Sequence, residues 1–194
     1  MPADDFVVTP WNVEGDIDYD KLIKRFGTQK ITAELLSKIE KFTKESHFML
    51  RRGIFFSHRD LNRLLDDYEK GKRFFLYTGR GPSGHTHIGH LVPWVFAKWL
   101  QDKFDTKMYF QLTDDEKFWT KKDMTLEETT NFALENALDF IALGFKPKNT
   151  KIIIDTKNIR TLYPIAAEFA KRINFSNTKA VFGFKNETNV GMIF

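Results

Sequence analysis

The chain has 194 residues, of which 42% are hydrophobic and 15% aromatic, and this composition excludes a disordered protein. Thirty Lys and Arg against 26 Asp and Glu leave a formal charge of only +4, which fits a phosphate-bearing partner and an ordinary surface equally well. There is no cysteine, so disulfides and thiolate metal sites are excluded. No apolar run approaches the roughly 18–20 residues that span a bilayer, and two acids stand where a secretory signal needs a basic segment. We therefore expect a cytoplasmic protein with no membrane role.

The first part of the chain predicts an extended arm followed by helices. Residues 1 to about 17 are rich in β-branched side chains and are broken by Pro10 and Gly15, which is typical of an extended segment. Apolar residues then recur at helical spacing in three segments with start and stop signals. The expected N-cap residues are Asp18, Thr32 and Ser57, the last paired with Asp60, and the expected terminal glycines are Gly27 and Gly71.

From residue 73 onward, strand and helix signals alternate. Short apolar runs at 73–79, 107–113 and 151–156 predict three buried strands, and AVFGF at 180–184 predicts a further one. Between them lie helical segments at 87–104, with Pro93 expected in the first turn, and at 125–145. The second helix should begin with a capping box of Thr125 and Glu128 and end at Gly144. Its expected core-facing residues are Leu134, Ala137, Leu138 and Ile141. Successive β–α units predict an α/β protein with a parallel, doubly wound sheet.

A Gly-rich, His-rich loop, GRGPSGHTHIGH, falls between the first of these strands and the helix behind it. At such a place backbone N–H groups and the helix dipole form an anion site, outside the carboxyl ends of the strands. In one interpretation a nucleotide lies on the bare backbone near Gly89, while His87 and His90 donate hydrogen bonds to its phosphates. In another, His85 and His87 form a zinc-binding pair. In a third, these are loop histidines with capping roles. A P-loop is excluded, because no Gly-Lys-Ser/Thr follows.

The segment PSGHTHIGH resembles the His-Ile-Gly-His motif of class I aminoacyl-tRNA synthetases, which binds ATP after the first strand of a Rossmann fold. The wider context, FVVTPWNV, RRGIFFSHRDLNRLLDDYEKGKRFFLYTGRGPSG, HIGHLVPWVFAKWLQDKF and FQLTDDEKFW, resembles the tryptophanyl-tRNA synthetases of eukaryotes and archaea. This resemblance implies a Rossmann-like fold with an N-terminal helical extension. Residues 1–72 would form the arm and the extension, and residues 73–194 the first half of the catalytic domain. The arm at Val7 to Val13, anchored by Trp11, would lie over the ATP and tryptophan site.

The resemblance also implies roles for individual residues. Tyr77 and Gln111 would hydrogen-bond the indole N–H of tryptophan, although without the family Tyr77 reads as a core aromatic. Glu116 would hold the α-amino group, with Thr113 beside it. Asp114 and Asp115 read as helix caps or surface residues with no catalytic role. The residues expected to stabilise charge on the phosphates are His87, His90 and Arg80, and those expected to bind ATP are Gly79, Arg80, Gly81, Pro82, Ser83, Gly84, His87, Gly89 and His90.

The implied reaction joins tryptophan to ATP as tryptophanyl-adenylate and then transfers the tryptophanyl group to tRNA(Trp). Mg²⁺ would accompany ATP, no residue is expected to hold a metal of its own, and a homodimer is expected. The family's second motif, Lys-Met-Ser-Lys-Ser, does not occur before Phe194, so the chain is expected to be an N-terminal portion. Two alternatives stay open: a zinc-dependent hydrolase that uses His85 and His87, and a non-catalytic binding fragment.

Overall fold

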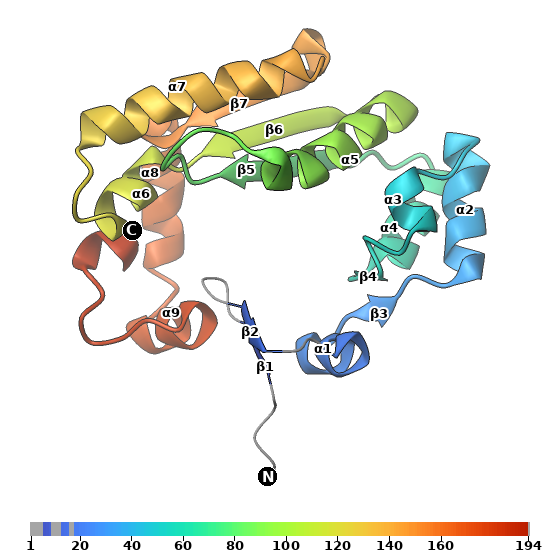
Figure 1. Cartoon of the computed structure of the whole chain (residues 1–194), viewed down its shortest axis with the longest axis horizontal. Coiled ribbons are helices and arrows are strands. Elements are labelled where there is room, and N and C mark those ends of the chain that lie inside the picture. Colours follow the sequence, from blue (N-terminus) through green and yellow to red (C-terminus); the bar gives the residue numbers. More distant parts are fainter. Residues whose placement is uncertain (1–5, 9–12, 16–17, 194) are drawn as a thin grey trace. The chain divides into compact units, whose positions relative to one another are not determined.

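The structure is a computed structural model that describes residues 6–8, 13–15 and 18–193. The chain divides into two compact units, Met1–Arg73 and Phe74–Phe194 (Figure 1). Among the described residues, no helix is both long and apolar enough to cross a membrane.

The first unit starts with a small hairpin. Strands β1 (Phe6–Val8) and β2 (Val13–Gly15) pair antiparallel, with Val7 opposite Glu14. The extended arm predicted from the sequence is confirmed for these two strands. Pro10 and Trp11, and with Trp11 the expected anchor of the arm, lie outside the described residues.

Helices α1 (Tyr19–Phe26) and α2 (Ala33–Thr43) begin where the capping signals predict. The Asp18 carboxylate accepts hydrogen bonds from two backbone N–H groups of the first turn of α1, each 3.0 Å long, and Gly27 ends the helix at φ 60°. The Thr32 hydroxyl accepts from the backbone N–H of Leu35, in α2. Such caps occupy N–H groups that have no partner inside the helix.

The third predicted helix starts later than expected. Ser57 is not its N-cap, because Ser57 and His58 form strand β4, which pairs antiparallel with β3 (Gln29–Lys30). Helix α4 (Leu61–Glu69) follows, and its first N–H donates to Nδ1 of His58. The backbone of Ser57 pairs with β3, and Nδ1 of His58, not the hydroxyl of Ser57, accepts the first N–H group of the helix. Short helix α3 (Phe48–Arg51) completes the unit, whose buried apolar side chains are Leu35, Ile39, Met49, Leu50 and Leu65.

The second unit is built on a parallel sheet in the order β5-β6-β7. Strands β5 (Phe75–Arg80) and β6 (Lys107–Leu112) are joined through α5 (Ile88–Phe104), and β6 is joined to β7 (Thr150–Ile154) through α6 (Asp114–Thr120), α7 (Leu126–Ala142) and the 3₁₀ turn η1 (Pro147–Asn149). Helices α8 (Asp155–Ala170) and α9 (Phe175–Phe182) and the turn η2 (Val190–Ile193) follow. The Rossmann-like parallel sheet predicted from the sequence is confirmed.

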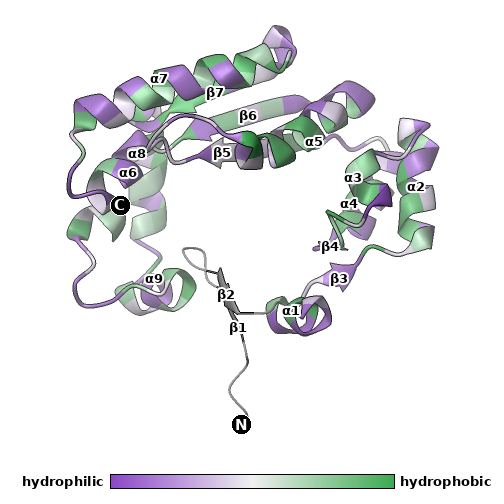
Figure 2. Ribbon diagram, in the orientation of Figure 1, coloured by the Kyte–Doolittle hydropathy of each residue, from purple (hydrophilic) through white to green (hydrophobic). Residues whose placement is uncertain are grey.

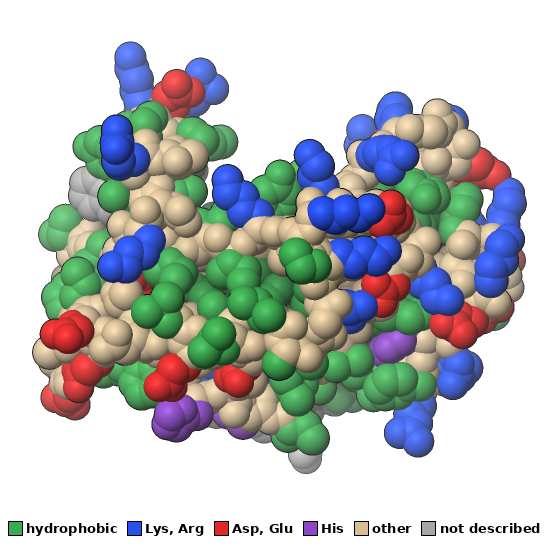
Figure 3. Space-filling model, turned by 90° about the horizontal axis from the view of Figure 1, so that it is seen from above, with side chains coloured by type: hydrophobic (Ala, Val, Ile, Leu, Met, Phe, Trp, Pro, Cys, Tyr) green, Lys and Arg blue, Asp and Glu red, His purple; other side chains and the backbone are tan. Residues whose placement is uncertain are grey.

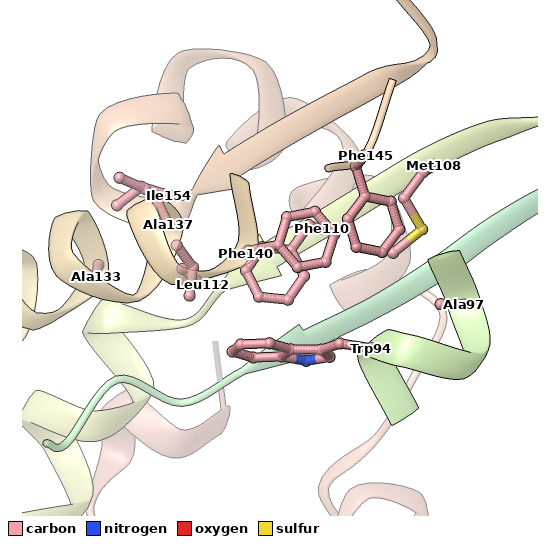
Figure 4. Close-up of a cluster of buried hydrophobic side chains, with 10 residues drawn as sticks. All are labelled: Trp94, Ala97, Met108, Phe110, Leu112, Ala133, Ala137, Phe140, Phe145 and Ile154. Carbon is pink, nitrogen blue, oxygen red and sulfur yellow. The ribbon is translucent and has the colours of Figure 1, made fainter. Parts of the chain in front are cut away.

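One hydrophobic core holds the sheet to its helices (Figure 4). The rings of Phe110, in β6, and Phe140, in α7, stack with centroids 3.7 Å apart, and Trp94, in α5, meets Phe110 edge-on at 5.1 Å. Both crossover helices therefore cover the same face of the sheet. A doubly wound sheet has helices on both faces. The helices of this cluster cover one of the two faces. The opposite face is where the site residues lie.

Of the four residues of helix α7 that were predicted to face the core, Ala137 is buried and the other three are exposed. Its capping box of Thr125 and Glu128 is confirmed, and Figure 2 shows hydrophobic and hydrophilic residues alternating along it. Ala133, Ala137 and Phe140 face the core, while Leu138 is 66% exposed. The helix carries two apolar stripes, and the one with alanines approaches the sheet more closely. Leu134, Leu138 and Ile141 stay exposed, and Figure 3 shows hydrophobic side chains gathered on the face seen from above.

Three further expectations were wrong. Pro93 lies inside α5 and not in its first turn, because the helix already begins at Ile88. The segment AVFGF is not a strand: it includes the end of α9, which Gly183 terminates at φ 69°. Strand β5 is not buried, because every second side chain, including Tyr77, points away from the core.

Candidate functional site

Two site residues predicted from the sequence lie on neighbouring strands, on the face opposite the core. Tyr77 alternates with Leu76, which packs against the core, and Gln111 lies between the fully buried Phe110 and Leu112. Strand alternation therefore turns Tyr77 and Gln111 to the same side. The Tyr77 hydroxyl donates a 2.5 Å hydrogen bond to Oε1 of Gln111. Tyr77 is 63% exposed, so it is not a core aromatic.

Asp155 is the third member of this group, and the sequence analysis missed it. Nε2 of Gln111 donates to both carboxylate oxygens of Asp155, at 2.8 and 2.9 Å. Asp155 is the first residue of α8, directly after β7, and only 7% of it is exposed. The three side chains form a continuous hydrogen-bonded chain across the three neighbouring strands, from Tyr77 in the middle of β5 to Asp155 directly after β7. The rule that ligands bind beyond the carboxyl ends of parallel strands could have pointed to Asp155.

The protonation of Asp155 is perturbed. Burial raises the pKa of its carboxyl from 3.8 to about 7, the hydrogen bonds from Gln111 oppose the rise, and the negative charges of Asp115, Asp114 and Glu116 add to it. Burial around the hydroxyl, together with the charge of Asp155, also raises the pKa of Tyr77. A carboxyl poised near neutral pH in a partly dry position is typical of functional sites.

Helix α6 carries the acidic residues of the TDDEK segment. Oε2 of Glu116 accepts from the hydroxyl of Thr113 at 2.7 Å, and its Oε1 pairs with Nζ of Lys117 at 3.0 Å. Burial raises the pKa of the neighbouring Asp115 carboxyl. The structure therefore brings Thr113 and Glu116 together, and it adds Lys117, which the sequence analysis did not select.

Asp114 is not a surface residue, and its carboxylate caps the start of α8 and not that of its own helix. It is fully buried, and its carboxylate accepts from the hydroxyl of Thr130 at 2.9 Å and from the hydroxyl and backbone N–H of Thr156 at 2.5 and 3.1 Å. These bonds join α6 to α7 and to the first turn of α8. Asp114 thus fixes the start of the helix that carries Asp155.

The glycine-rich loop is held in shape by Arg80, at the end of β5. Its guanidinium donates to the hydroxyl of Thr86 at 2.7 Å and to the carbonyls of Gly84 and His85 at 3.0 and 2.8 Å. The side chain of Lys117 lies over Gly81, where a Cβ would come within 1.9 Å of its Cε. Arg80 therefore fixes the form of the loop, and a side chain at residue 81 would displace the end of Lys117 from its present position.

The two histidines of the motif start helix α5. Nδ1 of His90 accepts from the backbone N–H of His87 at 3.2 Å, so a neutral His90 carries its proton on Nε2. Burial and the positive charge of Arg80 lower the pKa of His90, which keeps the ring neutral at pH 7. The His87 ring lies about 3 Å from where a Cβ on Gly89 would stand, at 3.1 and 3.2 Å. His90 can thus donate one neutral N–H in front of the helix N-terminus.

The structure gives no support to a zinc site. Nδ1 of His85 lies 3.1 Å from a carboxylate oxygen of Glu135, and the side chain is otherwise exposed. In residues 6–8, 13–15 and 18–193, no group of three or more His, Cys, Asp or Glu side chains is placed to hold a metal ion.

Comparison with known proteins agrees with this geometry. The family model of class I tRNA synthetases for W and Y matches residues 69–190. The tryptophan–tRNA ligases of Pyrobaculum calidifontis and Saccharolobus solfataricus are each 54% identical to the chain, over 98% and 100% of its length and 51% of theirs. The chain spans about half the length of these curated relatives.

Solved structures show the same similarity. The tryptophanyl-tRNA synthetase of Plasmodium falciparum superposes with a TM-score of 0.87 at 44% identity, covering 91% of this chain and 49% of that one. The tryptophanyl-tRNA synthetase of Encephalitozoon cuniculi, bound to tryptophan, gives 0.86 at 41% identity, covering 92% and 50%. With the family model matching more than half of its residues, the chain belongs to the class I tRNA synthetases of the tryptophan and tyrosine group.

Proposed function

We propose that this chain contributes the tryptophan- and ATP-binding part of a tryptophan–tRNA ligase. The observation that carries the proposal is the hydrogen-bonded chain of Tyr77, Gln111 and Asp155, which runs from the middle of β5 to the carboxyl end of β7 and is affected by the acidic residues at the start of α6. The names of the relatives favour tryptophan over tyrosine as the amino acid.

The indole ring of tryptophan would lie against the open face of β5 and β6. The hydroxyl hydrogen of Tyr77 is already used on Gln111, so the free lone pairs of its oxygen can accept the indole N–H. Glu116 would bind the α-ammonium group, because a cation leaving water needs a charged acceptor. The charges of Asp115 and Asp155 would add to the attraction of that cation.

ATP would bind along the loop at 79–84 and the first turn of α5. Backbone N–H groups, the dipole of α5 and the Nε2–H of His90 would meet the phosphates, with His87 beside them. Arg80 would act in two ways, since it braces the loop and also adds positive charge. Activation needs no protein nucleophile: the tryptophan carboxylate attacks the α-phosphorus and pyrophosphate leaves, so positioning and charge stabilisation would supply the rate. Mg²⁺ would arrive with the phosphates, because this cation usually keeps several waters and binds through substrate oxygens.

The proposal extends to the domains, the tRNA partner and the oligomeric state. Residues 1–72 would be the N-terminal arm and helical extension, and 73–194 the first half of the catalytic domain, and the acceptor would be tRNA(Trp). The exposed stripe of Leu134, Leu138 and Ile141 supports a homodimer, because contiguous apolar surface marks interfaces. Light scattering across a dilution series would test the dimer, and a monomer at every concentration would contradict it. A cytoplasmic location stays a prediction from the sequence.

Equilibrium dialysis of the chain with labelled tryptophan, and separately with tyrosine, tests the proposal. We expect tryptophan to bind, and Tyr77→Phe to weaken it about five- to tenfold through one lost hydrogen bond. Tyr163→Phe is the matched control, because this tyrosine is similarly exposed, at 58%, but lies on α8. Binding that does not distinguish tryptophan from tyrosine would contradict the proposal.

Tryptophan-dependent exchange of pyrophosphate into ATP then tests activation. Exchange that needs tryptophan and falls in His90→Ala would support a catalytic role for the loop. Tryptophan binding without any exchange would show that this chain binds substrates and does not activate them by itself.

A further inference from the structure

We propose that Asp155 is a positioning residue that sets the hydrogen-bond polarity of the amino-acid site, so that Tyr77 presents an acceptor to the substrate ring. The inference rests on the proposed function, since it concerns how the same site selects an aromatic ring that carries an N–H group.

Asp155 fixes the orientation of the Gln111 side-chain amide. An amide has a donor end and an acceptor end, and rotation by half a turn exchanges them. An ionised carboxylate only accepts hydrogen bonds, so Asp155 holds the nitrogen end through two contacts of 2.8 and 2.9 Å. Oε1 of Gln111 must then face Tyr77.

The orientation of the Gln111 amide in turn fixes the direction of its hydrogen bond with Tyr77. Because Gln111 offers only an oxygen, the Tyr77 hydroxyl must donate to it, and the distance of 2.5 Å between the two oxygens fits such a bond. The remaining groups on the tyrosine oxygen are lone pairs. Asp155 thus acts on the substrate through Gln111 and Tyr77. An N–H group on the substrate ring finds an acceptor at Tyr77, whereas an acceptor atom at the same place finds no donor.

The fold holds the carboxylate of Asp155 in position. It lies at the first position of α8, which Asp114 fixes through Thr156, so the carboxylate cannot easily move away. The charged groups that act on it are Asp114, Asp115 and Glu116, all on α6, and it in turn raises the pKa of Tyr77. Among the described residues no cation forms an ion pair with Asp155, and its main partner is the amide that it orients.

The test compares tryptophan with its benzothienyl analogue, in which sulfur replaces the indole N–H. The two ligands share the α-ammonium and carboxylate groups, so the ratio of their dissociation constants isolates the N–H contact. Asp155→Asn can donate as well as accept, so it frees Gln111 to rotate and also removes the charge that strengthens the hydrogen-bonded chain. We expect the preference for tryptophan to fall about tenfold, with the analogue's own affinity nearly unchanged. Asp123→Asn, an exposed carboxylate elsewhere in this unit, is the matched control.

A pH series gives an independent check on intact protein. Protonating Asp155 below about pH 7 should mimic the substitution, so the wild-type preference should fall between pH 8 and pH 5.5 while that of Asp155→Asn stays flat. Burial also raises the pKa of Asp115, but a change in the charge of Asp115 acts on both ligands alike and cancels in the ratio. Equal weakening of both ligands by Asp155→Asn would mean a merely structural role and would overturn the inference.

A ligand-free measurement separates this inference from the proposed function. The side-chain amide resonances of Gln111, assigned by their loss in Gln111→Met, should shift with pH near 7 and stop shifting in Asp155→Asn. If they do not titrate, the polarity argument fails even where tryptophan binds. If they titrate but tryptophan does not bind the wild-type chain, the proposed function fails, and the assignment of this polarity to substrate selection is overturned with it.

Discussion

Replacing Asp155 by Asn should stabilise the folded chain at neutral and alkaline pH and have much less effect in acid. Burial raises the pKa of this carboxyl from 3.8 to about 7, so the folded state holds a proton that the unfolded state has already released. Stability gained from that proton is complete below pH 3.8 and is lost as the pH rises through about 7. The Asn variant has no such proton to lose, so its advantage grows with pH.

The magnitude follows from the two pKa values. The difference between about 7 and 3.8, at about 1.4 kcal/mol for each tenfold change in acidity, gives a pH-dependent advantage of about 4 kcal/mol over the whole window. Of this, about 3 kcal/mol should appear between pH 5 and pH 8, where both proteins are easiest to study. A change of this size is large against the total stability of a small domain.

Urea unfolding of both proteins at several pH values measures the effect. The quantity to compare is the difference in unfolding free energy between Asp155→Asn and wild type, because other titrating groups contribute to both. Asp123→Asn should show no trend, since this side chain is exposed in the folded chain as well. A difference that stays constant from pH 5 to pH 8, or that shrinks, would refute the reasoning.

Three other substitutions test the framework around the site. Asp114→Ala should lower the unfolding free energy by about 3 kcal/mol, because it leaves the polar groups that this buried carboxylate accepts from without a partner, and a loss below 1 kcal/mol in urea unfolding would contradict that role. Arg80→Lys loses the planar fork that holds the loop, so hydrogen exchange at 84–86 should speed up several-fold while that of the core strands stays unchanged. Thr125→Ala should cost about 1 kcal/mol of stability through its lost cap on α7, with no change in tryptophan affinity, and thermal unfolding together with dialysis would show whether the two effects separate.

Local signals in the sequence predicted local structure well. The caps at Asp18, Thr32 and Thr125 are confirmed, because each depends on a side chain and an N–H group two or three residues away. Ser57 failed as a cap for the opposite reason. Its backbone pairs with Lys30, 27 positions earlier, and no pattern near residue 57 reports that contact.

The helices of the second unit show the same limit. Periodicity identified the apolar residues of α7 and correctly placed Ala137 in the core, but it did not indicate that Ala133 and Phe140, and not the exposed leucines, would pack against the sheet with it. The run AVFGF has strand-forming residues, yet Asn174 caps a helix just before it and Gly183 ends that helix, so the local caps decided the outcome over β propensity.

Some of the site residues can be indicated by a sequence motif, whereas others are brought into the site only by the fold. Family resemblance selected Tyr77 and Gln111, and the structure places them in hydrogen-bond contact, while their roles toward tryptophan stay predictions. Asp155 could not be found in that way, because it lies 44 positions after Gln111 and follows an ordinary strand. Only the parallel pairing of β6 with β7 brings the two side chains together.

The contrast between two neighbouring carboxylates separates a stabilising role from a functional one. Asp114 is buried with three hydrogen bonds from threonines on two other helices, so the fold gives the carboxylate well-matched partners. Asp155 is buried nearly as deeply, but the group that donates to its carboxylate is one neutral amide, and the charges that act on it are negative. A chain under selection for stability alone would keep Asp114 and replace Asp155 with a neutral isostere. A carboxylate retained where it costs stability is the arrangement expected of a residue whose benefit appears only when the substrate is bound.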